Sequence, residues 1–76
     1  MLTVLRLQRQ LKGLSQTALA QRAGLRSDFL CRIENRRVVA SRQQRQHLAK
    51  ALGSTEGKLF EEAGLARIWE GKDDAR

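Results

Sequence analysis

Apolar side chains recur at intervals of three and four residues along this chain, and no stretch alternates in the manner of a β-strand. Intervals of this length are typical of amphipathic α-helices. They predict five short helices, at about residues 4–12, 16–23, 27–35, 41–52 and 56–63. The side chains expected on the buried faces are Val4, Leu7 and Leu11; Leu19, Ala20 and Ala23; Leu30 and Ile33; Leu48, Ala49 and Leu52; and Leu59, Phe60 and Ala63. The predicted fold class is therefore all-α, a compact arrangement of five helices.

Glycines mark the predicted ends of several helices, and Gly24 is the most informative of them. Ser15 can cap the second helix, and Gly24 can end it in the left-handed conformation that glycine adopts without steric cost. A short helix, a turn of three or four residues and another helix together make a helix-turn-helix. Ala20 is small where the two helices would cross, and Leu25 can pack inward after the turn. The chain is therefore predicted to hold a helix-turn-helix at its second and third helices.

The charge of the chain is unevenly distributed. The whole sequence has a net charge of +7, from 15 Lys and Arg against 8 Asp and Glu. Residues 1–50 hold 11 of the basic residues and only Asp28 and Glu34 as acids, a net +9, whereas residues 51–76 have a net −2. A segregated basic region is expected where one face of a protein neutralises the phosphates of a nucleic acid. An anionic membrane surface is the competing partner. No apolar run reaches the ~18 residues that a helix spanning a membrane needs.

Candidates for catalysis or metal binding are few. His47 is the single histidine and has no second ligand at metal spacing, so we interpret it as a surface residue. Cys31 is the single cysteine, which excludes an internal disulfide and fits a reducing cytoplasm; we interpret it as a small packed residue rather than a redox sensor. No nucleophile–base pair, glycine-rich phosphate loop or carboxylate cluster is found. The sequence predicts a cytoplasmic protein that is not an enzyme and uses no cofactor or metal.

Four motifs make the sequence similar to a known family: GLSQ at residues 13–16, LAQRAGL at 19–25, RIEN at 32–35 and HLAKALG at 47–53. Through them the chain resembles the lambda-repressor-like helix-turn-helix proteins of the Cro/Xre type, over about residues 5–65. The resemblance implies a DNA-binding domain whose third helix enters the major groove with its first residues on base edges. We refer to this third helix as the reading helix. Residues 1–65 are the expected domain, and residues 66–76 are interpreted as a C-terminal tail.

The resemblance places four residues of the reading helix at the groove, namely Ser27, Asp28, Phe29 and Arg32. Arg32 is the best base reader on chemical grounds, because a guanidinium can bond O6 and N7 of guanine together. Asp28 could accept a hydrogen bond from cytosine or orient Arg32 one turn away. Phe29 could contact a thymine methyl group or belong to the core.

Other residues are expected to position the protein without reading sequence. The resemblance implies that Gln16 reaches a phosphate and braces the reading helix. Contacts to the sugar-phosphate backbone are expected from Arg36, Arg37, Ser41 and Arg42, unless this run is an ordinary group of solvated charges. The resemblance also implies a structural, buried ion pair between Arg9 and Glu34, and removing either partner would leave a charge buried alone.

The chain departs from the family pattern around the reading helix. Arg26 stands in place of a capping serine or threonine, so we expect the helix to begin at Ser27. Arg36 replaces a usual glycine and Ala40 a common proline, which predicts a differently shaped loop after the reading helix. Arg42 and Arg45 stand where leucine is common, so either their stems lie along the core or nearby valines fill the gap, namely Val38 and Val39.

A helix-turn-helix of this size reads only a few base pairs, so we expect a homodimer on an inverted-repeat operator with half-sites ~34 Å apart. The candidates for the dimer surface are Phe60, Leu65, Ile68 and Trp69, unless these side chains cap the core of the single chain. The predicted function is sequence-specific transcriptional regulation, with repression by blocking promoter access. The alternative is a protein-binding adaptor or antitoxin whose basic face contacts an acidic partner, such as a toxin or RNA polymerase.

Overall fold

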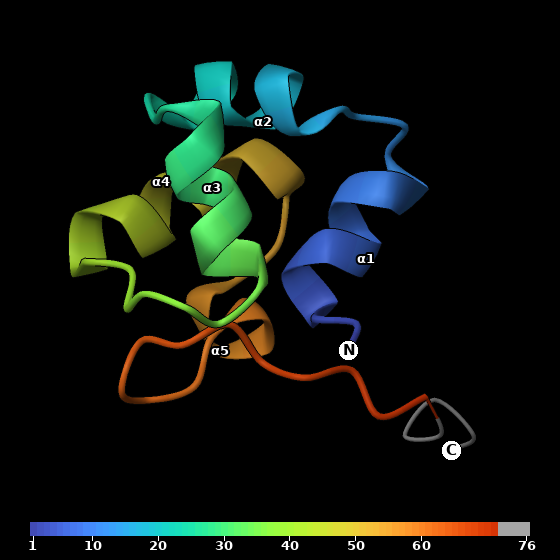
Figure 1. Ribbon diagram of the computed structural model, residues 1–76, viewed down its shortest axis with the longest axis vertical. Helices are drawn as coiled ribbons and strands as arrows, with labels where there is room; N and C mark the ends of the chain where they lie inside the picture. The colour runs from blue at the N-terminus through green and yellow to red at the C-terminus, as the bar shows by residue number, and fades with distance from the viewer. Residues whose placement is uncertain (72–76) are drawn as a thin grey trace.

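The computed structural model describes residues 1–71, and five helices account for most of this range (Figure 1). They are α1 Val4–Leu11, α2 Gln16–Ala23, α3 Ser27–Glu34, α4 Arg42–Leu52 and α5 Glu56–Leu59. Among the described residues the extended pairing is limited to two isolated antiparallel bridges, Thr3 with Ile68 and Phe60 with Ala66. The all-α prediction is confirmed. None of the helices in residues 1–71 combines the length and the apolar character needed to cross a bilayer.

The caps that begin and end α2 are those expected from the sequence. The Ser15 hydroxyl accepts a hydrogen bond from the backbone N–H of Ala18 at 3.0 Å. Gly24 ends the helix with φ 72°, a left-handed conformation that a residue with a Cβ adopts only at a steric cost. The backbone N–H of Leu25 then donates to the Ala20 carbonyl, so the chain turns sharply from α2 into α3. This turn and its two flanking helices are the predicted helix-turn-helix.

The core lies where α2 packs against both α3 and α4. In Figure 1, α2 crosses the top of the molecule, α3 runs down in front of α4, and α1 stands to one side. The predicted inward faces of α2, α3 and α4 are confirmed, because all of their members are buried: Leu19, Ala20, Ala23, Leu30, Ile33, Leu48, Ala49 and Leu52. Leu25 and Phe29 pack against the edge of this cluster.

The inward face of α1 was predicted wrongly. Leu11 is 71% exposed, while Val4 and Leu7 are only half-buried. The buried residues of this helix are Leu5 and Arg9, which are four positions apart and therefore lie on one face. A pattern of apolar residues alone misses this face, because one of its two members is charged.

The fifth helix and the tail also differ from the prediction. α5 ends at Leu59, and Phe60 is extended, with φ −132° and ψ 147°. The chain then turns back through Gly64 at φ 102°, which only glycine adopts readily, so Ala63 lies exposed at the turn instead of on a helix. Residues 65–70, which we name the C-terminal segment, run alongside the start of the chain.

The C-terminal segment belongs to the same core as the helices. Ala66 is fully buried. The Arg67 N–H donates to the Leu59 carbonyl at 2.9 Å, and the Arg67 carbonyl accepts from the Val4 N–H at 2.8 Å. The Trp69 N–H donates to the carbonyl of Leu2, also at 2.8 Å. The part of the predicted tail within the described range is therefore paired with both α5 and the N-terminus; residues 72–76 lie outside that range.

Candidate nucleic-acid interface

The outward face of α3 carries the residues expected at the DNA groove. Ser27, Asp28 and Arg32 are exposed, whereas Leu30 and Ile33 on the opposite face are buried. The helix begins at Ser27, as expected, and Arg26 at its N-cap makes no side-chain capping hydrogen bond. The structure therefore presents a polar first turn of α3 and an arginine one turn further along.

Asp28 is held by Arg26 rather than by Arg32. The guanidinium of Arg26 donates from Nε to the Asp28 carboxylate at 3.2 Å, and both side chains are largely exposed. Arg26 therefore joins this surface as a residue that sequence reasoning treated only as a poor cap. Because an exposed ion pair of this kind is weak, both groups remain available to an incoming partner.

Phe29 takes an intermediate position between the two roles considered for it. It packs against the core cluster and also lines a shallow groove of about 350 Å³ beside α3. The other lining residues are Gly24, Leu25, Arg26, Asp28, Arg32 and Gln44. The groove thus combines an apolar floor with a charged rim at the start of α3.

A buried ion pair holds α3 to the rest of the molecule. Arg9 Nε donates to Glu34 Oε2 at 2.6 Å and Arg9 Nη2 donates to Glu34 Oε1 at 3.2 Å. Arg9 also donates from Nη1 to the Leu14 carbonyl at 2.8 Å, which ties the turn before α2 to the same pair. The Arg9–Glu34 pair that the resemblance implied is present, and its carboxylate side chain is only 1% exposed.

Two more polar groups converge on Glu34. The side-chain amide of Gln16 donates to Glu34 Oε1 at 2.9 Å, so Gln16 contacts the last turn of α3 directly. This hydrogen bond is the bracing role expected of Gln16. It uses one of the two N–H groups of the amide, and the contact with a phosphate stays a prediction. The hydroxyl of Thr3 donates to the Glu34 carbonyl at 2.9 Å. Thr3 was missed from the sequence because nothing local marks a partner 31 residues away.

The α3–α4 loop, residues 35–41, and the start of α4 expose all but one of the residues predicted to contact the DNA backbone. Arg37, Ser41 and Arg42 are exposed on this loop and at the start of α4. Ser41 also caps α4, because its hydroxyl accepts from the Gln44 N–H and its own N–H donates to the Gln44 side chain. A serine in this position can still donate its hydroxyl hydrogen to a phosphate.

Arg36 is the exception. Its side chain contacts other parts of the protein and is not directed outward for the expected contact with the DNA backbone. Its guanidinium donates from Nη1 to Glu61 at 2.5 Å and to the Ala66 carbonyl at 2.7 Å. The side chain therefore lies against the C-terminal part of the chain and is only 22% exposed. The backbone has φ 60°, the left-handed conformation that a glycine usually supplies.

The gap expected beneath α4 is filled by an arginine stem and one valine. Arg45 is 20% exposed and donates from Nη1 to the Ala40 carbonyl at 2.5 Å. Val38 packs against the core, whereas Val39 is 55% exposed. The stem of Arg45 thus lies along the core while its charged end bonds the α3–α4 loop.

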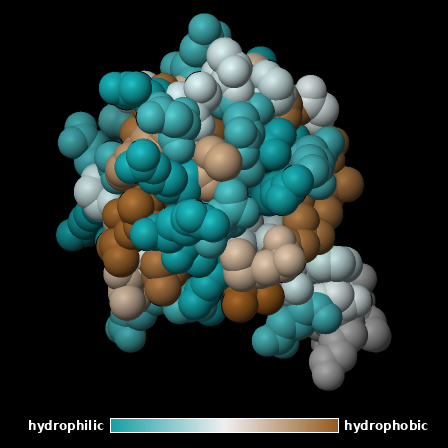
Figure 2. All heavy atoms as spheres, in the orientation of Figure 1, coloured by the Kyte–Doolittle hydropathy of each residue, from teal (hydrophilic) through white to brown (hydrophobic). Residues whose placement is uncertain are grey.

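Four exposed arginines lie on α3, at its N-cap, or on the α3–α4 loop with the start of α4. Figure 2, which has the orientation of Figure 1, shows hydrophilic residues covering most of the face over α3 and α4. The exposed arginines of α3, its N-cap and the α3–α4 loop with the start of α4 are Arg26, Arg32, Arg37 and Arg42. Asp28 is the acidic residue within this group. A basic face with a helix at its centre is suited to bind a polyanion.

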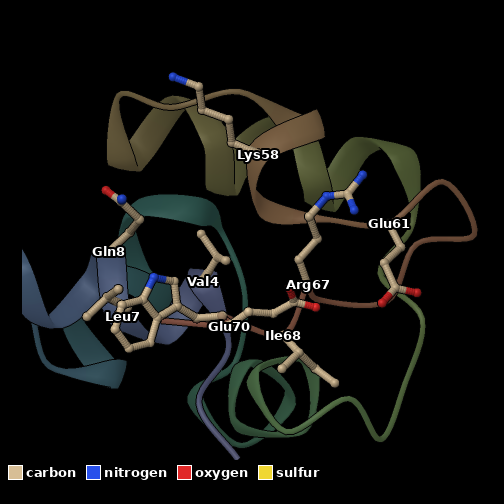
Figure 3. A pocket seen from close by; sticks show the side chains of 9 residues that line it. Val4, Leu7, Gln8, Lys58, Glu61, Arg67, Ile68 and Glu70 are labelled. Atoms are coloured by element: carbon tan, nitrogen blue, oxygen red, sulfur yellow. The ribbon is translucent and has the colours of Figure 1, made fainter. Parts of the chain in front are cut away.

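The candidates for a dimer surface separate into one core residue and three surface residues. Phe60 is 2% exposed and belongs to the core, so it caps the single chain and cannot supply a surface. Leu65 and Trp69 are half-buried, and Ile68 is 46% exposed. Ile68 and Trp69 line a cleft of about 640 Å³ between α1, α5 and the C-terminal segment (Figure 3).

Cys31 and His47 do not join the groups described above. Cys31 is half-buried and contacts the side chain of Asn35, and His47 is exposed on α4. Within residues 1–71 no set of three or more potential ligand side chains gathers in a geometry for a metal ion.

Comparison with known proteins agrees with this geometry. A family model described as a helix-turn-helix domain matches residues 2–63. The crystal structure of a hypothetical transcription factor, NHTF, from Neisseria is similar, with a TM-score of 0.67 and 31% sequence identity over 71% of this chain and 61% of that one. The chain thus spans less than two thirds of the length of that protein. No curated protein matches the chain. Because the family model covers all five helices, the chain belongs to the helix-turn-helix domain family.

Proposed function

We propose that this protein is a sequence-specific, double-stranded DNA-binding transcriptional regulator that acts without catalysis. The observation that carries the proposal is the outward face of α3, where Ser27, Asp28 and Arg32 are exposed and arginines flank them on either side. The buried Arg9–Glu34 pair supports it, because a reading helix must be held rigidly to place its side chains on base edges. The similar protein from Neisseria is described as a hypothetical transcription factor, which agrees with the proposal.

Arg32 is the proposed base reader and Arg37 a proposed phosphate contact. Replacing Arg32 with alanine should relax sequence preference by ~1–3 kcal/mol at one base pair, the value of a bidentate contact to guanine. Replacing Arg37 with alanine should weaken binding to all sequences alike and lower the salt slope of log K by about 1. The two variants lose the same charge and so control for each other. The groove assignment fails if both variants bind DNA as the parent does.

The proposed regulator acts as a homodimer on an inverted repeat and represses by blocking promoter access. An isologous dimer needs a self-complementary surface. The cleft beside the C-terminal segment offers one, because it combines apolar side chains with both signs of charge, namely Val4, Leu7, Ile68 and Trp69 with Lys58, Arg67, Glu61 and Glu70 (Figure 3). Trp69→Ala should therefore weaken self-association in sedimentation velocity, with Leu11→Ala on the exposed end of α1 as the control. Unchanged sedimentation of the Trp69 variant would remove this surface from consideration.

The test of the whole proposal is selection of bound duplexes from a random DNA pool at about physiological salt. Non-specific binding by a basic face weakens there, whereas specific binding persists. Enrichment of an inverted repeat with half-sites roughly one helical turn apart would support both the regulator and the dimer. Enrichment of a single half-site would support the regulator alone.

A second candidate function is a protein-binding adaptor or antitoxin on the same fold. The groove at the start of α3 favours it, since Leu25 and Phe29 give it an apolar floor beside Arg26 and Arg32. Such a groove suits an acidic partner with one apolar anchor, as a toxin or RNA polymerase could provide. Absence of any enriched DNA motif, together with capture of such a partner that Phe29→Ser abolishes, would favour this candidate over the first.

A further inference from the structure

Arg36 is held in a conformation that its residue type does not favour. It is the one non-glycine residue of the described range with positive φ, at 60°. For a residue with a Cβ this conformation is strained, and such strain persists only where the surrounding contacts impose it. Backbone hydrogen bonds close the end of α3 around this residue, from the Arg36 N–H to the Ile33 carbonyl at 3.1 Å and from the Arg37 N–H to the Arg32 carbonyl at 2.9 Å. The side chain is held separately, by two hydrogen bonds from the guanidinium to Glu61 and to the Ala66 carbonyl.

These bonds are part of a wider support beneath the α3–α4 loop. The Ala40 N–H donates to the Gly64 carbonyl at 3.0 Å, so the far end of the loop is fixed to the same turn. Gly64 is buried, and a Cβ placed on it would lie 2.6 Å from a methyl of Val39. The loop therefore rests on the turn formed by residues 60–66, at Arg36 on one side and at Ala40 on the other.

The residues that face outward lie directly after each of these two supports. Arg37 follows Arg36 directly, and Ser41 and Arg42 follow Ala40. Since phosphate contacts depend on where a loop holds its cations, a support on each side of the loop limits the positions that Arg37 and Arg42 can take. Arg36 is itself a cation, but its charge is paired with Glu61 and its side chain is only 22% exposed.

We propose that Arg36 is a positioning residue for DNA binding: its ion pair with Glu61 fixes the α3–α4 loop so that Arg37 and Arg42 meet the phosphate backbone. The proposal rests on the proposed DNA-binding function. In this proposal the guanidinium of Arg36 contacts the protein itself. A simple count of positive charges near the reading helix would instead predict that it contacts the nucleic acid.

The decisive variant is Glu61→Gln, because the two assignments predict opposite signs. Removing an acidic charge raises the net charge by one, so charge counting predicts tighter binding to DNA. Loss of the positioning ion pair predicts weaker binding, by about threefold or more if the pair is worth as much as a well-placed surface pair. Glu62→Gln is the matched control: the neighbouring carboxylate is exposed and forms no ion pair in the part of the chain that the structure describes.

Binding is measured by fluorescence anisotropy of the full chain on a labelled random-sequence duplex, over a series of salt concentrations. We expect Glu61→Gln to bind less tightly than Glu62→Gln and to lose about one unit of salt slope although no cation has been removed. Arg36→Gly, which suits the backbone conformation, should show the same two losses, and the double variant should be no worse than Arg36→Gly alone. Thermal melts locate a temperature at which every variant is fully folded, so that loss of stability does not enter the affinities.

Equal or tighter binding by Glu61→Gln relative to Glu62→Gln would overturn the proposal, because Arg36 would then be free to contact DNA. A parent protein that binds this duplex but enriches no motif from a random pool would refute sequence-specific regulation and leave the positioning role measurable. A parent that does not bind the duplex even at low salt would overturn both.

Discussion

The ion pair between Arg9 and Glu34 allows a quantitative test of how the reading helix is held. Glu34 accepts two hydrogen bonds from Arg9 and one from Gln16 in a site where its side chain is 1% exposed. Glu34→Ala removes the acceptor for all three and leaves the Arg9 guanidinium buried without a counter-charge. Breaking a buried pair in this way typically costs ~3–5 kcal/mol.

This loss is large for so small a protein. A chain of 76 residues is expected to have a free energy of unfolding of ~4–11 kcal/mol, from ~0.05–0.15 kcal/mol per residue. At ~4–8 °C per kcal/mol for a domain of this size, the melting temperature of Glu34→Ala should fall by at least ~12 °C. Urea unfolding followed by circular dichroism gives the free energy directly, by linear extrapolation.

The double variant Arg9→Met/Glu34→Leu distinguishes the contribution of the ion pair to stability from that of burying the apolar parts of the two side chains. Replacing both charges with apolar side chains is often neutral or stabilising, but here it also removes the donor to the Leu14 carbonyl. An unsatisfied buried acceptor costs ~1–3 kcal/mol, so the double variant should recover part of the loss, not all of it. A cost below ~1 kcal/mol for Glu34→Ala, or strict additivity of the two single changes, would show that the pair behaves as a surface salt bridge and would refute this reasoning.

Two further contrasts can be measured by the same urea titration. Gly24→Ala should cost ~1 kcal/mol, because its φ is 72° but no atom lies within 4 Å of the added Cβ. Gly64→Ala should cost more, ~2 kcal/mol or above, because the added Cβ would also lie 2.6 Å from a valine methyl; equal losses would show that the loop moves freely. Leu5→Ala should cost ~2–5 kcal/mol, whereas Leu11→Ala, at a position 71% exposed, should stay within ~0.5 kcal/mol of the parent. A larger loss of stability for Leu11→Ala than for Leu5→Ala would support the apolar face first predicted for α1.

The helix-turn-helix was predictable because its determinants are local. Gly24 ends α2, Ser15 begins it, and the apolar residues of both helices recur at helical spacing. Each of these signals operates within one or two turns of the chain. The face of α1 failed for the opposite reason: Arg9 is buried only because Glu34 lies beside it, and that partner is 25 residues away.

The candidate site shows the same division between local and distant determinants. Exposure of Ser27 and Arg32 follows from their place opposite Leu30 and Ile33 on one helix. The inward turn of Arg36 depends instead on Glu61 and on an extended segment that was predicted to continue a helix. Sequence periodicity contains no information about which distant carboxylate an arginine will meet.

The pairing of the chain's two ends bears on the order in which the protein folds. Thr3 and Ile68 are separated by 65 positions, from 3 to 68, so closing this contact confines nearly the whole chain. Contacts between α2 and α3 require only a short loop and are favoured early. The terminal pairing should therefore form last and open first, with the amides of Val4 and Trp69 exchanging through one common opening. Such an opening would also move the Ala66 carbonyl, which accepts a hydrogen bond from Arg36. Fluctuations at the chain ends would therefore loosen Arg36 and the loop beside the reading helix.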